Sequence, residues 1–212
     1  MTKSLQVQVK KEHYYNEYDD LDRWISYWHQ ISNVKKFNPE KVLEIGPGNK
    51  TVTRYLKKHD IKVQTVDIDS ALNPDVICDV RNLSNKLEEK SFDLILCSEV
   101  LEHIPWNDFE TSLQEIAKIS KEYVVISLPH RSFNFKISGK LLPFIEEKNL
   151  MLSLPIFRIK EYEFDGEHYW EVGYKGHSLK KIIQKMSKHF EIIETYRPYQ
   201  NPYHRFFILK TY

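Results

Sequence analysis

Residues 42–50 read VLEIGPGNK, an apolar run that ends in a bend with two glycines. The run is typical of a buried strand, and Gly46 and Gly48 let the backbone approach a ligand closely where that strand ends. A Gly-x-Gly-x-x-Gly dinucleotide fingerprint would need a third glycine at position 51, which is Thr51. A pyrophosphate ligand at this bend is therefore poorly supported.

Outward from this bend, short apolar runs alternate with helical patterns. We expect strands at 41–45, 63–68, 75–78, 92–98 and 123–128, and helices at 16–37, 107–120 and 178–188, with a short helix that starts with Val52, Tyr55 and Leu56. Two further strands, 190–196 and 205–211, are expected to form an antiparallel pair at one edge of the sheet. Continuous apolar strands between helices are typical of a parallel sheet covered on both faces. The sequence predicts a Rossmann-like, doubly wound α/β fold.

The chain of 212 residues fits one domain, 1–212, with two segments that stand apart from this alternation. Residues 1–37 end in the helix 16–37, and that helix is expected to pack on the domain as an N-terminal cap. Its apolar side chains recur on one helical face: Leu21, Trp24, Ile25, Trp28, Ile31 and Val34. Residues 131–175 are rich in Phe, Tyr, Lys and Pro and are interpreted as an insertion that covers part of the molecule.

Charge and composition narrow the classes of partner. The chain has 31 Lys and Arg against 30 Asp and Glu, a net charge of +1, which gives no general attraction to nucleic acid or anionic membranes. No apolar run approaches the ~18 residues of a membrane span, and the N-terminus lacks a signal-peptide pattern. Cys78 and Cys97 lie in apolar runs and are expected to be reduced and buried. A cytoplasmic location is the expectation.

Acidic side chains follow the first two predicted strands. Glu44, at the end of the first strand, would repel a pyrophosphate but suits a cationic ligand. S-adenosylmethionine carries an ammonium and a sulfonium and has no phosphate, so it is preferred over a dinucleotide. Asp67 comes 21 residues after Gly46, and a carboxylate at this spacing can accept hydrogen bonds from both ribose hydroxyls. Ile68 is expected to lie against the adenine face.

The next two strands end in a similar way. Asp79 follows the third strand and could accept a hydrogen bond from the adenine amino group, with Val80 adding an apolar contact. Ser98 ends the fourth strand near the expected place of the methionine tail. Each feature alone is weak, because aspartates at strand ends often cap helices. Together they form an ordered set at the strand ends, where open α/β sheets bind ligands.

The motifs VLEIGPGN (42–49), TVDID (65–69), CDVRNL (78–83) and FDLILCSEVLEHI (92–104) resemble the successive motifs of class I S-adenosylmethionine-dependent methyltransferases. The resemblance covers roughly residues 40–130. It implies a seven-stranded, mostly parallel sheet with a reversed last strand, S-adenosylmethionine as methyl donor, and the donor contacts assigned above. The sequence departs from the family at Lys50, where many members have a third glycine.

The resemblance implies methyl transfer, an in-line displacement in which an oxygen nucleophile also needs a base. Our candidates for this catalytic role are His130, which follows the fifth strand, and His168, which lies in the aromatic and acidic stretch 166–171. The insertion 131–175 would then cover a small-molecule acceptor. Two alternatives are left open for the N-terminal region: the stretch 13–15 and helix 16–37 close over the donor, or the helix only caps the sheet. His168 could equally lie on a surface loop.

A possible metal site is also left open. Glu99, Glu102 and His103 stand at i, i+3 and i+4, so a helix would place them on one face, and His168 could complete the set. The pattern resembles that of small-RNA 2′-O-methyltransferases, although related Glu-x-x-Glu-His runs occur without metal. We expect methylation of a small-molecule oxygen or nitrogen. The alternatives are a metal-dependent RNA methyltransferase, disfavoured by the near-neutral charge, and a non-catalytic donor-binding subunit.

Overall fold

The computed structural model describes residues 7–15, 18–139, 148–155 and 159–212. Its centre is a seven-stranded sheet with the strand order β3-β2-β1-β4-β5-β9-β8. The strands of this sheet are β1 (Lys41–Ile45), β2 (Lys62–Asp67), β3 (Val76–Ile77), β4 (Phe92–Ser98), β5 (Ser120–Pro129), β8 (Phe190–Tyr196) and β9 (His204–Thr211). The four long helices are α1 (Leu21–Lys36), α2 (Thr51–Lys58), α3 (Phe109–Ile119) and α4 (Leu179–Met186).

Strand directions confirm the predicted α/β class. β1 pairs in parallel with β2 and β4, β2 with β3, and β4 with β5. The last strand, β9, runs antiparallel to both β5 and β8 and lies between them. The sheet is therefore mostly parallel with a reversed last strand, and the two final strands form the expected antiparallel pair at one edge.

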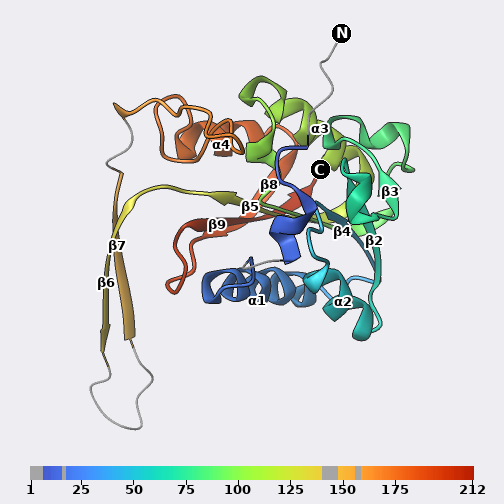
Figure 1. The fold of residues 1–212 in the computed structure, drawn as a ribbon, viewed down its shortest axis with the longest axis horizontal. Helices are drawn as coiled ribbons and strands as arrows, with labels where there is room; N and C mark the ends of the chain where they lie inside the picture. Colours follow the sequence, from blue (N-terminus) through green and yellow to red (C-terminus); the bar gives the residue numbers. More distant parts are fainter. Residues whose placement is uncertain (1–6, 16–17, 140–147, 156–158) are drawn as a thin grey trace.

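Helices cover both faces of the sheet, as Figure 1 shows with the sheet edge-on: α1 and α2 lie on one face, α3 and α4 on the other. Two apolar clusters correspond to these two layers. Val34 of α1 and Leu56 of α2 pack with Leu94 and Ile208 on one side. On the other side a larger cluster contains the buried residues of α3 and α4. Both faces of the sheet are thus buried, as its continuous apolar strands predict.

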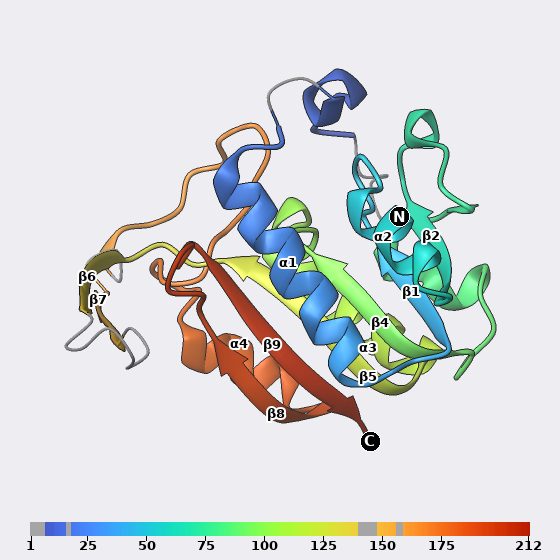
Figure 2. The same ribbon diagram turned by 90° about the horizontal axis from the view of Figure 1, so that it is seen from below.

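The face of α1 that packs on the sheet differs from the prediction. The helix begins at Leu21, where the side chain of Asp20 accepts a hydrogen bond of 2.7 Å from Arg23 N. Trp24 and Trp28, assigned to the packing face, are 53% and 63% exposed. Val34 of the predicted face is buried, and Tyr27, Gln30 and Asn33 are buried as well. Figure 2 shows α1 lying across the strands of the sheet. Polar groups occupy this face because they have partners: Asn33 Nδ2 donates to Tyr196 Oη over 2.9 Å.

The insertion divides into two parts with different positions. β6 (Phe133–Gly139) and β7 (Lys148–Leu154) form an antiparallel hairpin that projects away from the main sheet (Figure 1). The following part returns to the domain through Trp170, which is fully buried and donates its indole hydrogen bond to Ile104 O over 3.0 Å. Residues 140–147 and 156–158 of the predicted insertion lie outside the described residues. The segment around Trp170, rather than the hairpin, is the part of the insertion that is buried in the domain.

Cys97 is buried and Cys78 partly buried, and both are free thiols. Within the ranges described above, no helix combines the length and the apolar character needed to cross a lipid bilayer.

Candidate functional site

A cavity of about 280 Å³ opens at the carboxyl ends of β1, β2 and β4. Its volume is close to the lower end of the range for small-molecule sites, about 300–1,000 Å³. Every residue predicted to contact the donor lines this cavity: Glu44, Gly46, Gly48, Asp67, Ile68, Asp79, Val80 and Ser98. Residues spread over 55 positions of sequence therefore meet at one site, because parallel strands bring their ends to the same edge.

Glu44, one residue before the end of β1, has a buried carboxylate. Its side chain accepts a hydrogen bond of 2.5 Å from Thr53 Oγ1, and burial raises the pKa of the Glu44 carboxyl to about 7. The bend that follows needs glycine: Gly46 has φ +69°, and a Cβ added there would lie 2.4 Å from Val100 Cγ2. The site thus combines a desolvated acid with a backbone that a side chain would obstruct.

Asp67 and Asp79 line the cavity from the ends of β2 and β3. Asp67 Oδ1 accepts a hydrogen bond of 2.8 Å from Asp69 N, and burial raises the pKa of its carboxyl. Asp79 also has a structural role, since it caps the following 3-10 helix and forms an ion pair with Arg81 Nη2 at 2.6 Å. Arg81 in turn contacts Asp108 at 2.7 Å. The Asp79 carboxylate is therefore held rigidly at the cavity wall.

Ser98, at the end of β4, presents an unsatisfied polar atom. Its Oγ is buried and has no hydrogen-bond partner among the described residues. A buried hydroxyl without a partner costs free energy unless a bound ligand or water completes its hydrogen bond. The cavity thus contains a polar group that a ligand can satisfy.

The N-terminal segment forms part of the cavity wall. His13, Tyr14 and Tyr18 line it, and a Cβ added to Gly48 would lie 3.2 Å from Tyr14 Cδ1. The rings of Tyr14 and Tyr18 meet edge to face at 5.1 Å. Of the two alternatives for this region, the stretch 13–15 contributes to the site, whereas Trp24 and Trp28 point to solvent. The α1 helix also covers one face of the sheet.

Several lining residues were not predicted from sequence. Arg23 and Tyr27 of α1 line the cavity, as do Tyr203 and His204 at the start of β9. The Arg23 guanidinium lies 4.2 Å from the centre of the Tyr18 ring. Two signals could have found Arg23: it is the one cation in the stretch 18–28, and it stands next to the predicted apolar face.

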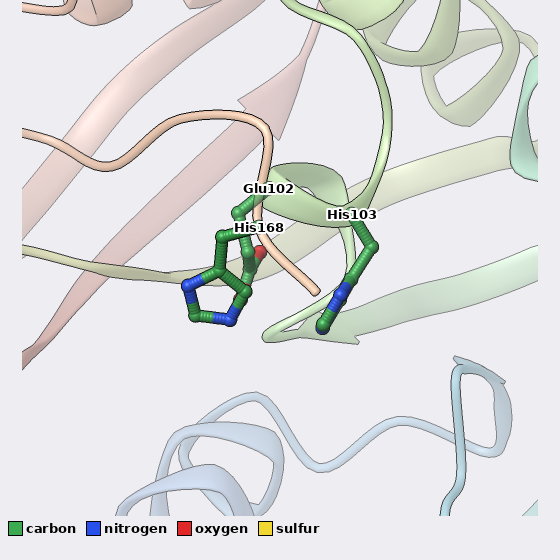
Figure 3. Close-up of side chains that lie close together, drawn as sticks. All are labelled: Glu102, His103 and His168. Atoms are coloured by element: carbon green, nitrogen blue, oxygen red, sulfur yellow. The ribbon is translucent and has the colours of Figure 1, made fainter. Parts of the chain in front are cut away.

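His103 and His168 line the cavity. The buried Glu102 lies beside them, as Figure 3 shows. Side-chain donor atoms of these three residues lie within 4.8 Å of one another. Burial lowers the pKa of His168, but the hydrogen bond and charge of Glu171 outweigh it and raise the pKa. For Glu102, burial and the neighbouring Glu99 raise the pKa of the carboxyl well above its usual range.

Glu99 does not join this group, so the predicted helical face of Glu99, Glu102 and His103 is wrong. Glu99 has φ +53°, outside any helix, and only a 3-10 turn over Leu101–His103 follows it. The left-handed backbone turns its side chain toward β5 and β9. Glu99 Oε1 accepts a hydrogen bond of 2.8 Å from Ser127 Oγ, and Oε2 lies 3.5 Å from His204 Nε2.

His130 is placed differently from the other predicted catalytic residue. It is not among the residues that line the cavity, whereas His168 is. His130 Nδ1 accepts a hydrogen bond of 2.9 Å from Arg205 Nε, and the residue is buried. Burial, with the charges of Arg197 and Arg205, lowers the pKa of His130 to about 3. Its position and its weak basicity both disfavour a catalytic role for His130.

A model of a protein family described as "Methyltransferase domain" matches residues 14–186 of this chain. The match includes the glycine bend, all of the predicted donor contacts and His168. A comparison with curated proteins finds no match.

Solved structures with the same fold include three that align over most of both chains. The N-methyltransferase NodS from Bradyrhizobium japonicum, in complex with S-adenosyl-L-homocysteine, has a TM-score of 0.59 at 12% identity, covering 91% of this chain and 89% of its own. The 1,6-didemethyltoxoflavin-N1-methyltransferase from Burkholderia thailandensis has a TM-score of 0.59 at 15% identity, covering 94% and 84%. A protein from Pyrococcus horikoshii has a TM-score of 0.62 at 11% identity, covering 96% and 100%.

Proposed function

This chain belongs to the methyltransferase domain family, as the resemblance of its motifs predicts, and we propose that it transfers a methyl group from S-adenosylmethionine to an oxygen or nitrogen atom of a small molecule. One observation carries the proposal: the residues assigned to the donor from sequence line a single cavity at the strand ends. NodS and the didemethyltoxoflavin enzyme, both crystallised with S-adenosylhomocysteine, support this choice of donor.

The donor takes its place along the strand ends. Glu44 attracts the cationic methionine end, and the Gly46 bend lets the backbone approach it. Asp67 accepts the ribose hydroxyl hydrogens, while Asp79 accepts from the adenine amino group. Ser98 Oγ, which lacks a partner among the described residues, donates to or accepts from the donor's polar tail.

Arg23 adds a contact that the sequence did not predict. S-adenosylmethionine has a carboxylate beside its ammonium group, and Arg23 is a cationic lining residue close to Tyr18. A guanidinium can donate two parallel hydrogen bonds to a carboxylate. We assign Arg23 to this carboxylate, which complements the role of Glu44 at the ammonium.

The acceptor binds at the end of the cavity formed by His103 and His168. Both side chains reach the cavity, and His168 is held by a 3.2 Å contact between its Nδ1 and Glu171 Oε1. The two neighbours named above are N-methyltransferases, and the substrate printed for one of them is a small heterocycle.

Methyl transfer itself requires alignment more than acid chemistry. The lone pair of the acceptor forms a bond to the methyl carbon while the carbon–sulfur bond breaks, and its electrons return to sulfur as a neutral thioether. The acceptor loses one proton. We assign that proton to the free ring nitrogen of His168, since Nδ1 already faces Glu171.

A cytoplasmic location remains part of the proposal. Its support is chemical: Cys78 and Cys97 are free thiols, which is typical of reducing compartments. The near-neutral charge of +1 gives no support for a nucleic-acid acceptor.

Transfer of labelled methyl groups tests the proposal. The full chain is incubated with methyl-labelled S-adenosylmethionine and a cell extract that has been separated into small-molecule, RNA and protein fractions. We expect label in the small-molecule fraction and strongly reduced label with His168→Gln, although that variant still binds S-adenosylhomocysteine. Label in RNA would support the metal-dependent RNA enzyme instead. Donor binding without transfer to any fraction would support a non-catalytic subunit.

A further inference from the structure

Three potential ligand atoms meet where the cavity reaches the 3-10 turn after β4. Glu102 is fully buried, and neither of its carboxylate oxygens has a hydrogen-bond partner among the described residues. One donor atom each from Glu102, His103 and His168 lies within 4.8 Å of the others (Figure 3). A buried carboxylate without partners is costly, so a group that is not a protein side chain is expected to satisfy it.

The two imidazoles are oriented by their second nitrogen atoms. His103 Nδ1 lies 3.0 Å from Glu167 O, and because a carbonyl only accepts, Nδ1 carries the hydrogen. His168 Nδ1 lies 3.2 Å from Glu171 Oε1, which also accepts from Tyr203 Oη over 2.6 Å. In the neutral form, both rings therefore keep a lone pair on Nε2. Metal-binding histidines are held in this way, with the other ring nitrogen donating to a carboxylate or carbonyl.

We propose that Glu102, His103 and His168 bind one divalent transition-metal ion of the zinc or iron(II) type. Two imidazoles and one carboxylate form the donor set of open sites for these ions. Ligand atoms about 2.0–2.2 Å from an ion are at most ~4.4 Å apart, so small side-chain rotations suffice to close the site. Glu99 is not a ligand, because Ser127 and His204 hold its carboxylate.

An ion with three protein ligands keeps open positions, and here the two histidines border the cavity. This consequence rests on the proposed function: an acceptor oxygen would bind at an open position, and the ion would lower the pKa of that hydroxyl. In the metal-bound protein, the Nε2 atom of His168 is a ligand, and the ion replaces the imidazole in activating the acceptor. An oxygen acceptor would then be favoured over a nitrogen acceptor.

Metal binding is tested without any methyl transfer. The full chain is freed of metal with a chelator and titrated with Zn²⁺ by calorimetry and with Co²⁺ by visible absorption. We expect one ion per chain and the absorption bands of protein-bound cobalt. His103→Gln and His168→Gln should each weaken binding at least tenfold. The exposed His59 is not among the residues that line the cavity, and it gives the control His59→Gln with unchanged binding.

Thermal unfolding supplies a second readout. In the metal-free protein, Glu102→Met should raise the melting temperature, because it removes a buried carboxylate that has no partner among the described residues. Zn²⁺ should raise the melting temperature of the wild type but not that of Glu102→Met. Absence of stoichiometric Zn²⁺ and Co²⁺ binding would overturn the proposal, as would unchanged binding in both histidine variants. S-adenosylhomocysteine binding is measured on the same samples. If it persists while metal binding fails, the metal site is refuted and the proposed function is not.

A separate observation concerns the β6–β7 hairpin. The register pairs Phe133 with Leu154, Phe135 with Leu152 and Ile137 with Leu150, so these six side chains share one face of the hairpin. All of them are 45% to 67% exposed. The opposite, polar face turns toward the domain: Ser153 Oγ accepts from Arg197 Nη1 over 3.1 Å, and Lys136 Nζ donates to Gln200 O over 3.0 Å.

The structure assigns this apolar face to a second copy of the chain. A two-stranded hairpin is marginally stable in water unless its apolar face is covered. Each of the six large apolar side chains has about half of its surface exposed, so the face offers on the order of 600 Å² of accessible apolar area. Two copies related by a two-fold axis would bury about 1,200 Å², which reaches the lower end of stable interfaces. The central pair, Phe135 and Leu152, would then meet its symmetry mate.

Sedimentation of the full chain tests this interface. We expect a dimer for the wild type and a monomer for Phe135→Lys and Leu152→Lys. Asn149→Lys places the same charge on the opposite face of the hairpin and should leave the dimer intact. A wild type that stays monomeric at all concentrations would overturn the proposal. If that monomer bound lipid vesicles, the face would belong to a membrane contact instead.

Discussion

Thr53 Oγ1 donates a hydrogen bond of 2.5 Å to the buried carboxylate of Glu44, at the point where the first strand meets the glycine bend. This bond and the nearby lysines favour the ionised carboxylate, but burial outweighs them and raises the pKa of Glu44 to about 7. A group with this pKa changes its charge near neutral pH. We therefore expect Glu44 to link the protonation state of the cavity to both donor binding and stability.

Donor affinity should depend on pH through Glu44. Because only the ionised carboxylate attracts the cationic donor, we expect S-adenosylmethionine binding to strengthen as pH rises toward about 7 and to level off above it. The slope below the pKa should reach at most about tenfold per pH unit. Calorimetric titrations over this pH range measure the effect. Glu44→Gln should bind more weakly and without this slope, and the same slope in the variant would refute the assignment.

Stability without ligand should change in the opposite direction. The pKa of Glu44 is raised above its unfolded value of 4.5, so its stabilising effect is fully present below 4.5 and is lost as pH rises through about 7. We expect this group to account for a fall of up to about 3 kcal/mol in the free energy of unfolding. Urea denaturation at several pH values measures it. A wild type and a Glu44→Gln variant with parallel pH profiles would contradict this prediction.

Asp67 is expected to hold the ribose of the donor. Asp67→Ala removes two hydrogen bonds and should weaken S-adenosylhomocysteine binding by about 1–3 kcal/mol. Asp60 is exposed and is not among the lining residues, so Asp60→Asn is a matched control with unchanged affinity. Equal affinities of the wild type and Asp67→Ala would remove the ribose assignment.

A substitution at Gly46 tests whether the glycine bend must stay free of a side chain. Gly46→Ala combines φ +69° with a methyl group 2.4 Å from Val100 Cγ2, and it should lose donor binding and destabilise the fold by about 1–3 kcal/mol. Gly176 has φ +86° with nothing within 4 Å of an added Cβ. Gly176→Ala therefore reports the backbone strain alone and should retain donor affinity. Calorimetry and thermal melts separate the two effects.

Trp170 anchors the second part of the insertion. Trp170→Phe leaves the carbonyl of Ile104 without its indole partner and opens a small cavity, so we expect a loss of about 2–3 kcal/mol in the free energy of unfolding. Trp28, at 63% exposure, provides the control Trp28→Phe, expected to stay within about 0.5 kcal/mol of the wild type. A similar loss in both variants would show that Trp170 has no special role.

The meeting of the assigned donor residues at one cavity could be predicted from the sequence, because it depends on strand ends. An apolar run marks each buried strand, and a parallel sheet brings the residues that follow Ile45, Val66 and Cys97 to one edge. The position of a residue at a strand end can be predicted without knowledge of side-chain packing. The antiparallel pair β8 and β9 was predicted for the same reason, since both are short apolar runs at the end of the chain.

The wrong predictions concern positions that tertiary contacts decide. Periodicity placed Trp24 and Trp28 of α1 against the sheet, but both are exposed. The side of α1 that packs on the sheet carries Asn33, which donates a hydrogen bond to Tyr196 of β8. The spacing of Glu99 and Glu102 predicted one helical face, but the positive φ of Glu99 cannot be read from spacing. Arg23 was missed because apolar periodicity does not say which side of α1 meets the cavity, although Arg23 is the one cation in the stretch 18–28.

Calorimetric titration of the full chain with S-adenosylhomocysteine tests the central claim most directly. The account predicts saturable binding of one ligand per chain, strongly weakened by Asp67→Ala and abolished by Gly46→Ala, with both variants folded by circular dichroism. A folded wild type that shows no saturable heat with either S-adenosylhomocysteine or S-adenosylmethionine would contradict it.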